Sequence, residues 1–133
     1  MSVRILIADD DLAIRRLVRR LLEEHAEWCV VGEAETGSDA VSKARDLSPD
    51  LIVMDLAMPK MNGLQAAREI RRAKPDMPML LLTVQEVSPE LVSEARKVGF
   101  QGAVSKSSGS EVIIGVEELL RAHSYFKRSD LPA

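Results

Sequence analysis

The sequence predicts an α/β protein in which strands form one parallel sheet with helices on both faces. Three observations lead to this prediction. Short apolar runs alternate five times with segments of helical periodicity. The third and fourth runs, residues 51–54 and 78–84, are almost continuous and rich in Leu, Ile, Val and Met, which is typical of strands buried on both faces. The chain has 133 residues, enough for one domain with a real core.

The first strand is predicted over residues 3–8, and the three aspartates Asp9, Asp10 and Asp11 follow it directly. From Leu12 the apolar residues recur with helical spacing, and Asp11 or Asp10 is the expected N-cap of that helix. Its apolar stripe is predicted to contain Ile14, Leu17, Val18, Leu21 and Leu22. The opposite face is predicted to be solvated and to carry Arg15, Arg16, Arg19 and Arg20.

The middle of the chain continues the alternation. A second, weaker strand is predicted over residues 29–34, with Cys29 as a small buried hydrophobe in it. Thr36 opens the helix that follows. The third strand ends at Asp55, and a loop rich in turn-forming residues leads to a helix over about residues 64–72.

The fourth strand, residues 78–84, is followed by a helix with clear boundaries. Ser88 is its expected N-cap, a proline occupies its first position, and Gly99 stops it. A short fifth strand is predicted over residues 102–105.

The last helix is predicted to begin at a capping box, because Ser108 and Glu111 have the required spacing. Its buried stripe is predicted to contain Val112, Val116, Leu119 and Leu120. The polar tail from Tyr125 is predicted to be frayed.

Polar side chains gather at one edge of this predicted sheet. Strands that alternate with helices imply right-handed crossovers and a doubly wound parallel sheet, and we expect the flavodoxin-like (βα)5 strand order 2-1-3-4-5. That order brings Asp9 and Asp10, after the first strand, beside Asp55 at the end of the third. Thr83 and Lys106 end the fourth and fifth strands and line the other side of the same pocket.

The chemistry of this pocket follows from its charges. Three crowded carboxylates cannot all stay ionised without a cation, and oxygen ligands without His or Cys suit Mg²⁺ or Mn²⁺. The ion and Lys106 would balance the three aspartates, so Asp55 could attack a phosphoryl group and form an aspartyl phosphate. Singly, each residue has a structural explanation as a helix cap, a strand end or a surface lysine. Their joint placement favours the functional explanation.

The composition limits the alternatives. The net charge is −3, there is a single cysteine, and no apolar run approaches the length of a membrane span. We therefore expect a cytoplasmic protein without an internal disulfide or membrane contact. The acidic balance gives no support for direct nucleic-acid contact by this segment.

Four motifs together resemble the receiver domain of two-component response regulators. They are ILIADD at residues 5–10, DLAMPKMNG at residues 55–63, the pair Leu82-Thr83 and the pair Ser105-Lys106. The resemblance covers about residues 3–122. It implies a signal-transducing phosphoprotein that takes part in a phosphorelay.

The resemblance also implies a role for each residue of the pocket. Asp55 would accept the phosphoryl group from a sensor histidine kinase. Lys106 would pair with that group, and Thr83 would move to bond it. Mg²⁺ would be held by Asp9, Asp10, Asp55 and the backbone carbonyl of Ala57.

The chain departs from the family pattern at two positions. Family members usually carry an aromatic residue three positions before the lysine, and here that position is Ala103. The usual coupling between Thr83 and an aromatic side chain therefore cannot operate in that form. Ser107 stands where proline often follows the lysine, and we predict a trans bond between Lys106 and Ser107.

The resemblance implies a regulatory domain that is not an enzyme, although it can catalyse its own phosphorylation and dephosphorylation. Phosphorylation is expected to change a partner surface on the fourth helix, fifth strand and last helix, through which a homodimer can form. We expect a receiver domain over residues 1–124 and a tail or linker start over residues 125–133. Either the protein is a single-domain regulator, or the chain is a module of a transcription regulator with a C-terminal helix-turn-helix output domain.

Two other functions would use similar elements. Aspartate-nucleophile phosphatases that resemble haloacid dehalogenases usually have a second acid two residues after the first, and here that residue is Ala57. A flavodoxin-like nucleotide binder needs a Gly-rich or Ser/Thr-rich phosphate loop after the first strand. Asp9, Asp10 and Asp11 would repel a phosphate there in the absence of a metal.

Overall fold

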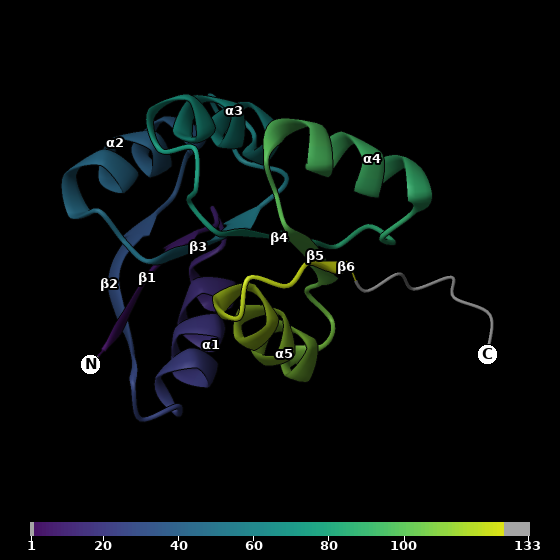
Figure 1. Cartoon of the computed structure of the whole chain (residues 1–133). Coiled ribbons are helices and arrows are strands. Elements are labelled where there is room, and N and C mark those ends of the chain that lie inside the picture. Colours follow the sequence, from purple (N-terminus) through teal and green to yellow (C-terminus); the bar gives the residue numbers. More distant parts are fainter. Residues whose placement is uncertain (1, 127–133) are drawn as a thin grey trace, which may run out of the picture.

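Strands and helices alternate along residues 2–126, which the computed structural model describes (Figure 1). The strands are β1 (Val3–Ala8), β2 (Trp28–Ala34), β3 (Leu51–Asp55), β4 (Met79–Thr83), β5 (Gly102–Ser105) and β6 (Tyr125–Phe126). The helices are α1 (Leu12–Glu23), α2 (Gly37–Leu47), α3 (Gly63–Ala73), α4 (Pro89–Val98) and α5 (Gly109–Leu120). Within the described residues, none of these helices has the length and apolar character that crossing a membrane requires.

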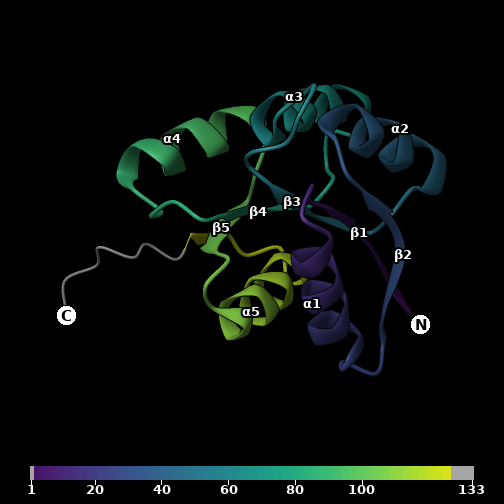
Figure 2. The ribbon, with the colours of Figure 1, turned by 180° about the vertical axis from the view of Figure 1, so that it is seen from behind.

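All six strands run parallel in one sheet of order β2-β1-β3-β4-β5-β6. β1 pairs directly with β3, for example Ile7 opposite Val53, because β2 lies on the outer side of β1. Helices α2, α3 and α4 cover one face of the sheet, and α1 and α5 cover the other (Figures 1 and 2). The predicted α/β class and the order 2-1-3-4-5 are confirmed, and β6 is added at the edge.

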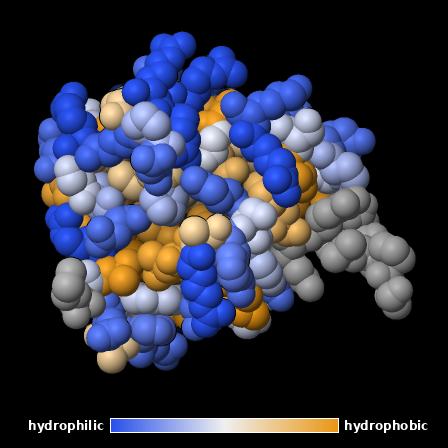
Figure 3. Space-filling model, in the orientation of Figure 1, coloured by the Kyte–Doolittle hydropathy of each residue, from blue (hydrophilic) through white to orange (hydrophobic). Residues whose placement is uncertain are grey.

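Alternate residues of the central strands enter two separate cores. In β1, Ile5 and Ile7 pack into the core shared with α1 and α5, whereas Leu6 and Ala8 pack into the core shared with α2, α3 and α4. The same alternation holds in β3 and β4, since successive side chains of a strand point to opposite faces. On the face seen in Figure 3, hydrophobic surface is limited to patches between hydrophilic side chains. Because a core packs against each face of the sheet, the sheet and the ends of its strands are held in place.

Side-chain caps explain where most of the helices begin. Four of them are capped by Asp11, Thr36, Asn62 and Ser88. Within the described residues Ser108 makes no side-chain cap bond, so the predicted capping box at α5 is wrong. The Glu111 carboxylate instead accepts a hydrogen bond from the Tyr125 hydroxyl, and the Ser108 hydroxyl lies 3.3 Å from that of Ser110.

Three predictions of burial are wrong. Leu17 and Leu120 are 43% and 37% exposed, and Cys29 is exposed on the edge strand β2. The neighbours of Cys29 in the strand point into the core, so its own side chain points to the opposite face. The buried side of α1 is rotated from the predicted one and consists of Arg15, Val18 and Leu22.

The end of the described chain is ordered by the sheet. Tyr125 and Phe126 lie opposite Gly102 and Ala103 in a parallel pairing with β5, so the frayed tail predicted from Tyr125 is wrong for these two residues. Residues 127–133 of that predicted tail lie outside the described residues. The predicted trans bond before Ser107 is confirmed, since no cis peptide bond occurs in the described part of the chain.

Candidate functional site

Four predicted site residues meet at the carboxyl ends of β1, β3 and β5. Lys106 Nζ lies 2.7 Å from Asp9 Oδ2 and 3.0 Å from Asp55 Oδ1. One carboxylate oxygen from each of Asp9, Asp10 and Asp55 lies within 4.8 Å of the other two. Asp9 and Asp55 are buried, whereas Asp10 is exposed. The pairing of β1 with β3 therefore produces the acidic cluster, and β5 supplies its counter-charge.

The chain around Asp55 is held by a close approach of β3 and α3. Asp55 is the last residue of β3, and the amide of Gly63 donates to the carbonyl of Leu56 at 2.8 Å. A Cβ atom at Gly63 would overlap the backbone oxygen of Asp55. The capping box between Asn62 and Gln65 fixes the start of α3 at the same place. Glycine at position 63 thus lets the helix begin directly behind the carboxylate.

Burial dominates the ionisation of this site. It raises the pKa of Asp55 to about 6, and the negative charge of Asp9 acts in the same direction. Contacts with Lys106 and the backbone amide of Ala57 partly offset both effects. Burial also disfavours the charged form of Lys106, but its contacts with Asp9 and Asp55 prevail and raise its pKa above the ordinary value. Lys106 therefore stays protonated. The ionised form of Asp55 is unfavourable at this buried position, so a further cation nearby would stabilise it.

The acidic cluster fits a hard divalent cation. Asp9 Oδ1 accepts the amide hydrogen of Asp11 at 2.9 Å. Asp9 Oδ2 is buried, is ion-paired with Lys106, and accepts no well-directed hydrogen bond from any described residue. A cavity of about 530 Å³ opens at the same end of the sheet, lined by Asp10, Leu56, Ala57, Met58, Pro59 and Asn62. A set of carboxylate and carbonyl oxygens beside an open cavity could hold Mg²⁺ together with water.

Thr83 lies at the same edge of the sheet, where it ends β4. Thr83 is buried, and its hydroxyl accepts the amide hydrogen of Gln85 at 2.9 Å. The amide of Lys106 donates to the carbonyl of Thr83 at 2.9 Å, which ties the ends of β4 and β5 together. All the side chains predicted for the site are therefore placed at one end of the sheet, and the backbone of Ala57 lines the cavity there.

Arg15 contacts this site although the sequence predicted it on a solvated face. It is only 6% exposed, and its Nη1 donates to the backbone carbonyl of Asp9 at 2.7 Å. Its Nε donates to Glu33 Oε1 at 2.9 Å. The spacing of Arg15 from Val18 and Leu22 is that of one helical stripe, and this signal was available in the sequence. The prediction of a fully solvated arginine face is wrong for Arg15.

Comparisons with known proteins agree with this geometry. A family model described as the response regulator receiver domain matches residues 5–116. The chain is 38% identical over 110 residues to the transcriptional regulatory protein YdfI of Bacillus subtilis (strain 168), which covers 83% of this chain and 51% of that protein. It is 32% identical over 129 residues to the response regulator UvrY of Escherichia coli (strain K12), and this match covers 97% of this chain and 59% of UvrY.

A solved structure is similar over nearly the whole chain. It is a two-component response regulator of the LuxR family from Aurantimonas sp. SI85-9A1, with a TM-score of 0.90 and 31% sequence identity. The match covers 98% of this chain and 92% of that one. The chain spans little more than half the length of the curated relatives that it matches.

Proposed function

This chain belongs to the response regulator receiver domain family, and we propose that it is a phosphoacceptor switch in which Asp55 receives a phosphoryl group. The observation that carries the proposal is the meeting of three carboxylates and one lysine at the carboxyl ends of parallel strands. Asp55 is the member of this cluster at the end of the central strand β3, and the two residues after it, Leu56 and Ala57, line the cavity.

In the proposed reaction an Asp55 carboxylate oxygen attacks the phosphorus atom of the donor. A P–O bond to Asp55 forms while the bond from phosphorus to the leaving group breaks, and the leaving group takes the electron pair. Lys106 stays positively charged and stabilises the negative charge that arrives with the phosphoryl group. The Thr83 hydroxyl accepts the amide hydrogen of Gln85 before the reaction. After it, the hydroxyl donates a hydrogen bond to a phosphoryl oxygen instead.

We propose that Asp9, Asp10 and Asp55, with the backbone carbonyl of Ala57, hold the Mg²⁺ that this reaction needs, or Mn²⁺ in its place. The buried, under-satisfied oxygen Asp9 Oδ2 supports this assignment. When bound, the ion would neutralise charge on the carboxylates and on the phosphoryl oxygens. The protein contributes the preformed oxygen cluster and keeps Lys106 beside it.

The proposed donor is a phosphohistidine of a sensor histidine kinase, as in other two-component systems. A phosphoramidate is a good donor because its P–N bond breaks readily once the nitrogen is protonated. Ala57 stands two residues after the nucleophile and provides no acid to protonate a poor leaving group. We therefore place the chain among regulatory domains that take a phosphoryl group from an activated donor, and not among phosphatases with turnover.

The proposed output is control of transcription through a further domain. The similar proteins YdfI and UvrY are a transcriptional regulatory protein and a response regulator, and both are longer than the matched segment. We propose that the receiver domain spans residues 1–124, with β6 (Tyr125–Phe126) added to its sheet, and that the chain after β6 begins a linker to a helix-turn-helix domain. Such a regulator works in the cytoplasm, and this segment makes no direct contact with nucleic acid.

The proposed partner surface comprises α4, β5 and α5, through which phosphorylation would favour a homodimer. Ala103 replaces the usual aromatic residue of β5, so a different group has to carry the change from Thr83 to this surface. On α5 the exposed apolar side chains within the described residues are Ile114 and Leu120. They are candidates for the contact with a second copy.

Intact mass measurement after incubation with acetyl phosphate tests the proposed function. We expect one added phosphoryl group that depends on Mg²⁺ on the wild-type chain and none on Asp55→Asn. Lys106→Met is a second variant, which we expect to slow the reaction while keeping Asp55 in place. An adduct of equal yield on Asp55→Asn would overturn the assignment of the acceptor.

A further inference from the structure

Arg15 occupies a position where an apolar residue would be expected. It lies on the buried stripe of α1 together with Val18 and Leu22. Its guanidinium is nevertheless a charged group among apolar neighbours. Withdrawing such a group from water is unfavourable unless it is well paired, so its contacts identify what it does there.

The guanidinium of Arg15 joins β2 to the loop that follows β1. Its Nε donates to Glu33 Oε1 at 2.9 Å, and its Nη1 donates to the Asp9 carbonyl at 2.7 Å. Glu33 lies on β2, and its other oxygen accepts from Arg19 Nη1 at 2.6 Å. A third, longer contact of 3.4 Å joins Arg15 Nη2 to the exposed Glu35. The planar fork of Arg15 is thus oriented by Glu33 and directed at one backbone oxygen.

That backbone oxygen belongs to the peptide between two residues of the acidic cluster. A peptide unit is planar, so a hydrogen bond to the Asp9 carbonyl fixes the orientation of the whole Asp9–Asp10 peptide. The Asp9 amide donates to the Ala34 carbonyl at 2.9 Å, which holds the other side of the same residue. The direction in which the exposed Asp10 side chain leaves the backbone therefore depends on Arg15.

Stability alone does not explain this arrangement. A buried ion pair is often no more stabilising than apolar residues of the same volume. In contrast, groups that orient metal-binding residues commonly change metal affinity tenfold or more when they are removed. A buried arginine aimed at the backbone between two acidic residues matches the second case.

We propose that Arg15 is a positioning residue for phosphoryl acceptance, which fixes the Asp9–Asp10 peptide while Glu33 holds its guanidinium. The inference rests on the proposed function, since it assigns Arg15 to the same acidic cluster. Arg15 touches neither the phosphoryl group nor a metal, and it acts through the backbone of Asp9.

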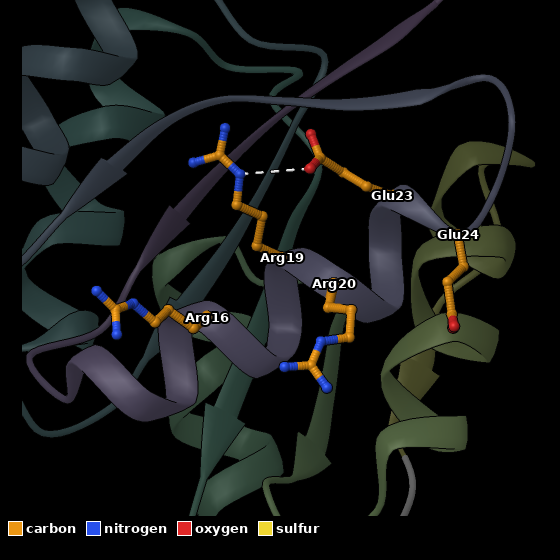
Figure 4. Close-up of a pocket in the computed structure, with 5 residues that line it drawn as sticks. All are labelled: Arg16, Arg19, Arg20, Glu23 and Glu24. Atoms are coloured by element: carbon orange, nitrogen blue, oxygen red, sulfur yellow. Dashed lines mark hydrogen bonds and ion pairs between the residues drawn. The ribbon is translucent and has the colours of Figure 1, made fainter.

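Arg19 is the matched control for this role. It lies one turn further along α1 and shares Glu33 with Arg15, but its remaining contacts are with Glu23 at 3.3 Å and the Val30 carbonyl at 3.4 Å. Figure 4 shows Arg19 turned towards Glu23, whereas Arg16 and Arg20 point in other directions. Replacing Arg19 removes one of the two arginines that bind Glu33. It keeps the hydrogen bond from Arg15 to the Asp9 carbonyl.

The test measures the Mg²⁺ dependence of phosphorylation by acetyl phosphate on the wild-type chain, Arg15→Met, Arg15→Lys and Arg19→Met. We expect Arg15→Met to raise the Mg²⁺ concentration for half-maximal rate by about tenfold, with a much smaller change in the rate at saturating Mg²⁺. Lysine can reach one of the two acceptors, so Arg15→Lys should fall between Arg15→Met and wild type. Arg19→Met should stay within about twofold of wild type.

Calorimetric titration of Mg²⁺ into the same proteins, below the unfolding temperature of each, separates the possible failures. If the wild-type chain takes no phosphoryl group, the proposed function fails, and the Mg²⁺ affinities still decide the role of Arg15. Equal Mg²⁺ affinity in wild type and Arg15→Met would overturn the inference, as would equal losses in Arg15→Met and Arg19→Met. If Arg15→Met does not fold, Glu33→Gln takes its place, and its predicted effect is a weaker loss of Mg²⁺ affinity in the same direction.

Discussion

Asp55 is a carboxylate whose ionised form is unfavourable in the folded protein. Burial and the charge of Asp9 raise its pKa to about 6 despite the contact with Lys106. A folded-state pKa above the unfolded value means that the folded chain binds the proton more tightly, so stability increases as the pH falls through this range. Without a metal ion, Asp55 therefore lowers the free energy of unfolding at neutral pH.

Replacing Asp55 by Asn should consequently stabilise the metal-free protein. We expect the free energy of unfolding of Asp55→Asn to exceed that of wild type by about 1–3 kcal/mol near pH 7.5, from the size of the pKa shift. The difference should shrink as the pH falls below about 6 and vanish only below about pH 3, where Asp55 is protonated in both the folded and the unfolded wild-type chain. Urea unfolding across this range measures it. A variant less stable than wild type at neutral pH would contradict the assignment of an unfavourable charge.

The same pKa predicts how Mg²⁺ affinity depends on pH. Protons compete with the metal for Asp55, so we expect the affinity to be constant well above pH 6 and to fall about tenfold per pH unit below it. Calorimetric titration at several pH values checks this. Asp55→Asn is the control, because its residual affinity should lack the transition near pH 6. An inflection near the ordinary aspartate pKa would contradict the raised pKa of Asp55.

At the scale of single elements, four helices begin with a hydrogen bond from a backbone amide to the N-cap side chain, and within the described residues α5 begins without one. The Ser88 hydroxyl accepts the amide hydrogen of Leu91 at 3.1 Å, whereas Ser108 makes no such bond to any described residue. We expect Ser88→Ala to lower the free energy of unfolding by about 1 kcal/mol. Ser108→Ala should change it by less than about 0.5 kcal/mol. Equal losses in thermal unfolding experiments would show that Ser108 caps α5 in solution.

The elements also show which local features a sequence can predict. Strands and helix boundaries were predictable because apolar runs, prolines, glycines and capping residues act within a few positions. The orientation of α1 was predicted wrongly because its apolar residues allow two overlapping stripes, and the one chosen included Leu17. Burial of the charged Arg15 is favourable only because tertiary packing brings Glu33 and the Asp9 carbonyl to it. Local sequence features do not show these contacts.

At the scale of the whole molecule, topology made most of the site predictable. Parallel strands place their carboxyl ends together, so Asp9, Asp10, Asp55 and Lys106 could be assigned to one pocket from strand order alone. β6 could not be predicted, because two residues form a strand only beside the open edge of β5. The cation–π contact of 4.3 Å between Arg96 and the Phe126 ring also depends on this tertiary pairing.

Oligomeric state is the property of the whole molecule that the proposed switch should change. With Mg²⁺ and beryllofluoride as a mimic of the phosphoryl group, we expect the chain to shift from monomer towards dimer. Asp55→Asn should not respond to the mimic. Light scattering coupled to size-exclusion chromatography measures both. An Ile114→Glu variant tests the surface, because a charge on the exposed side of α5 should weaken the dimer without affecting phosphorylation.

Chemical identification of the phosphorylated residue tests the central claim most directly. Borohydride reduces an aspartyl phosphate to homoserine with release of phosphate, so peptide mass spectrometry after reduction marks the acceptor. We predict homoserine at position 55, formed only after incubation with a phosphoryl donor and Mg²⁺. Homoserine at Asp9 or Asp10, or an adduct that survives on another residue when Asp55 is unmodified, would contradict the assignment of Asp55 as the phosphoacceptor.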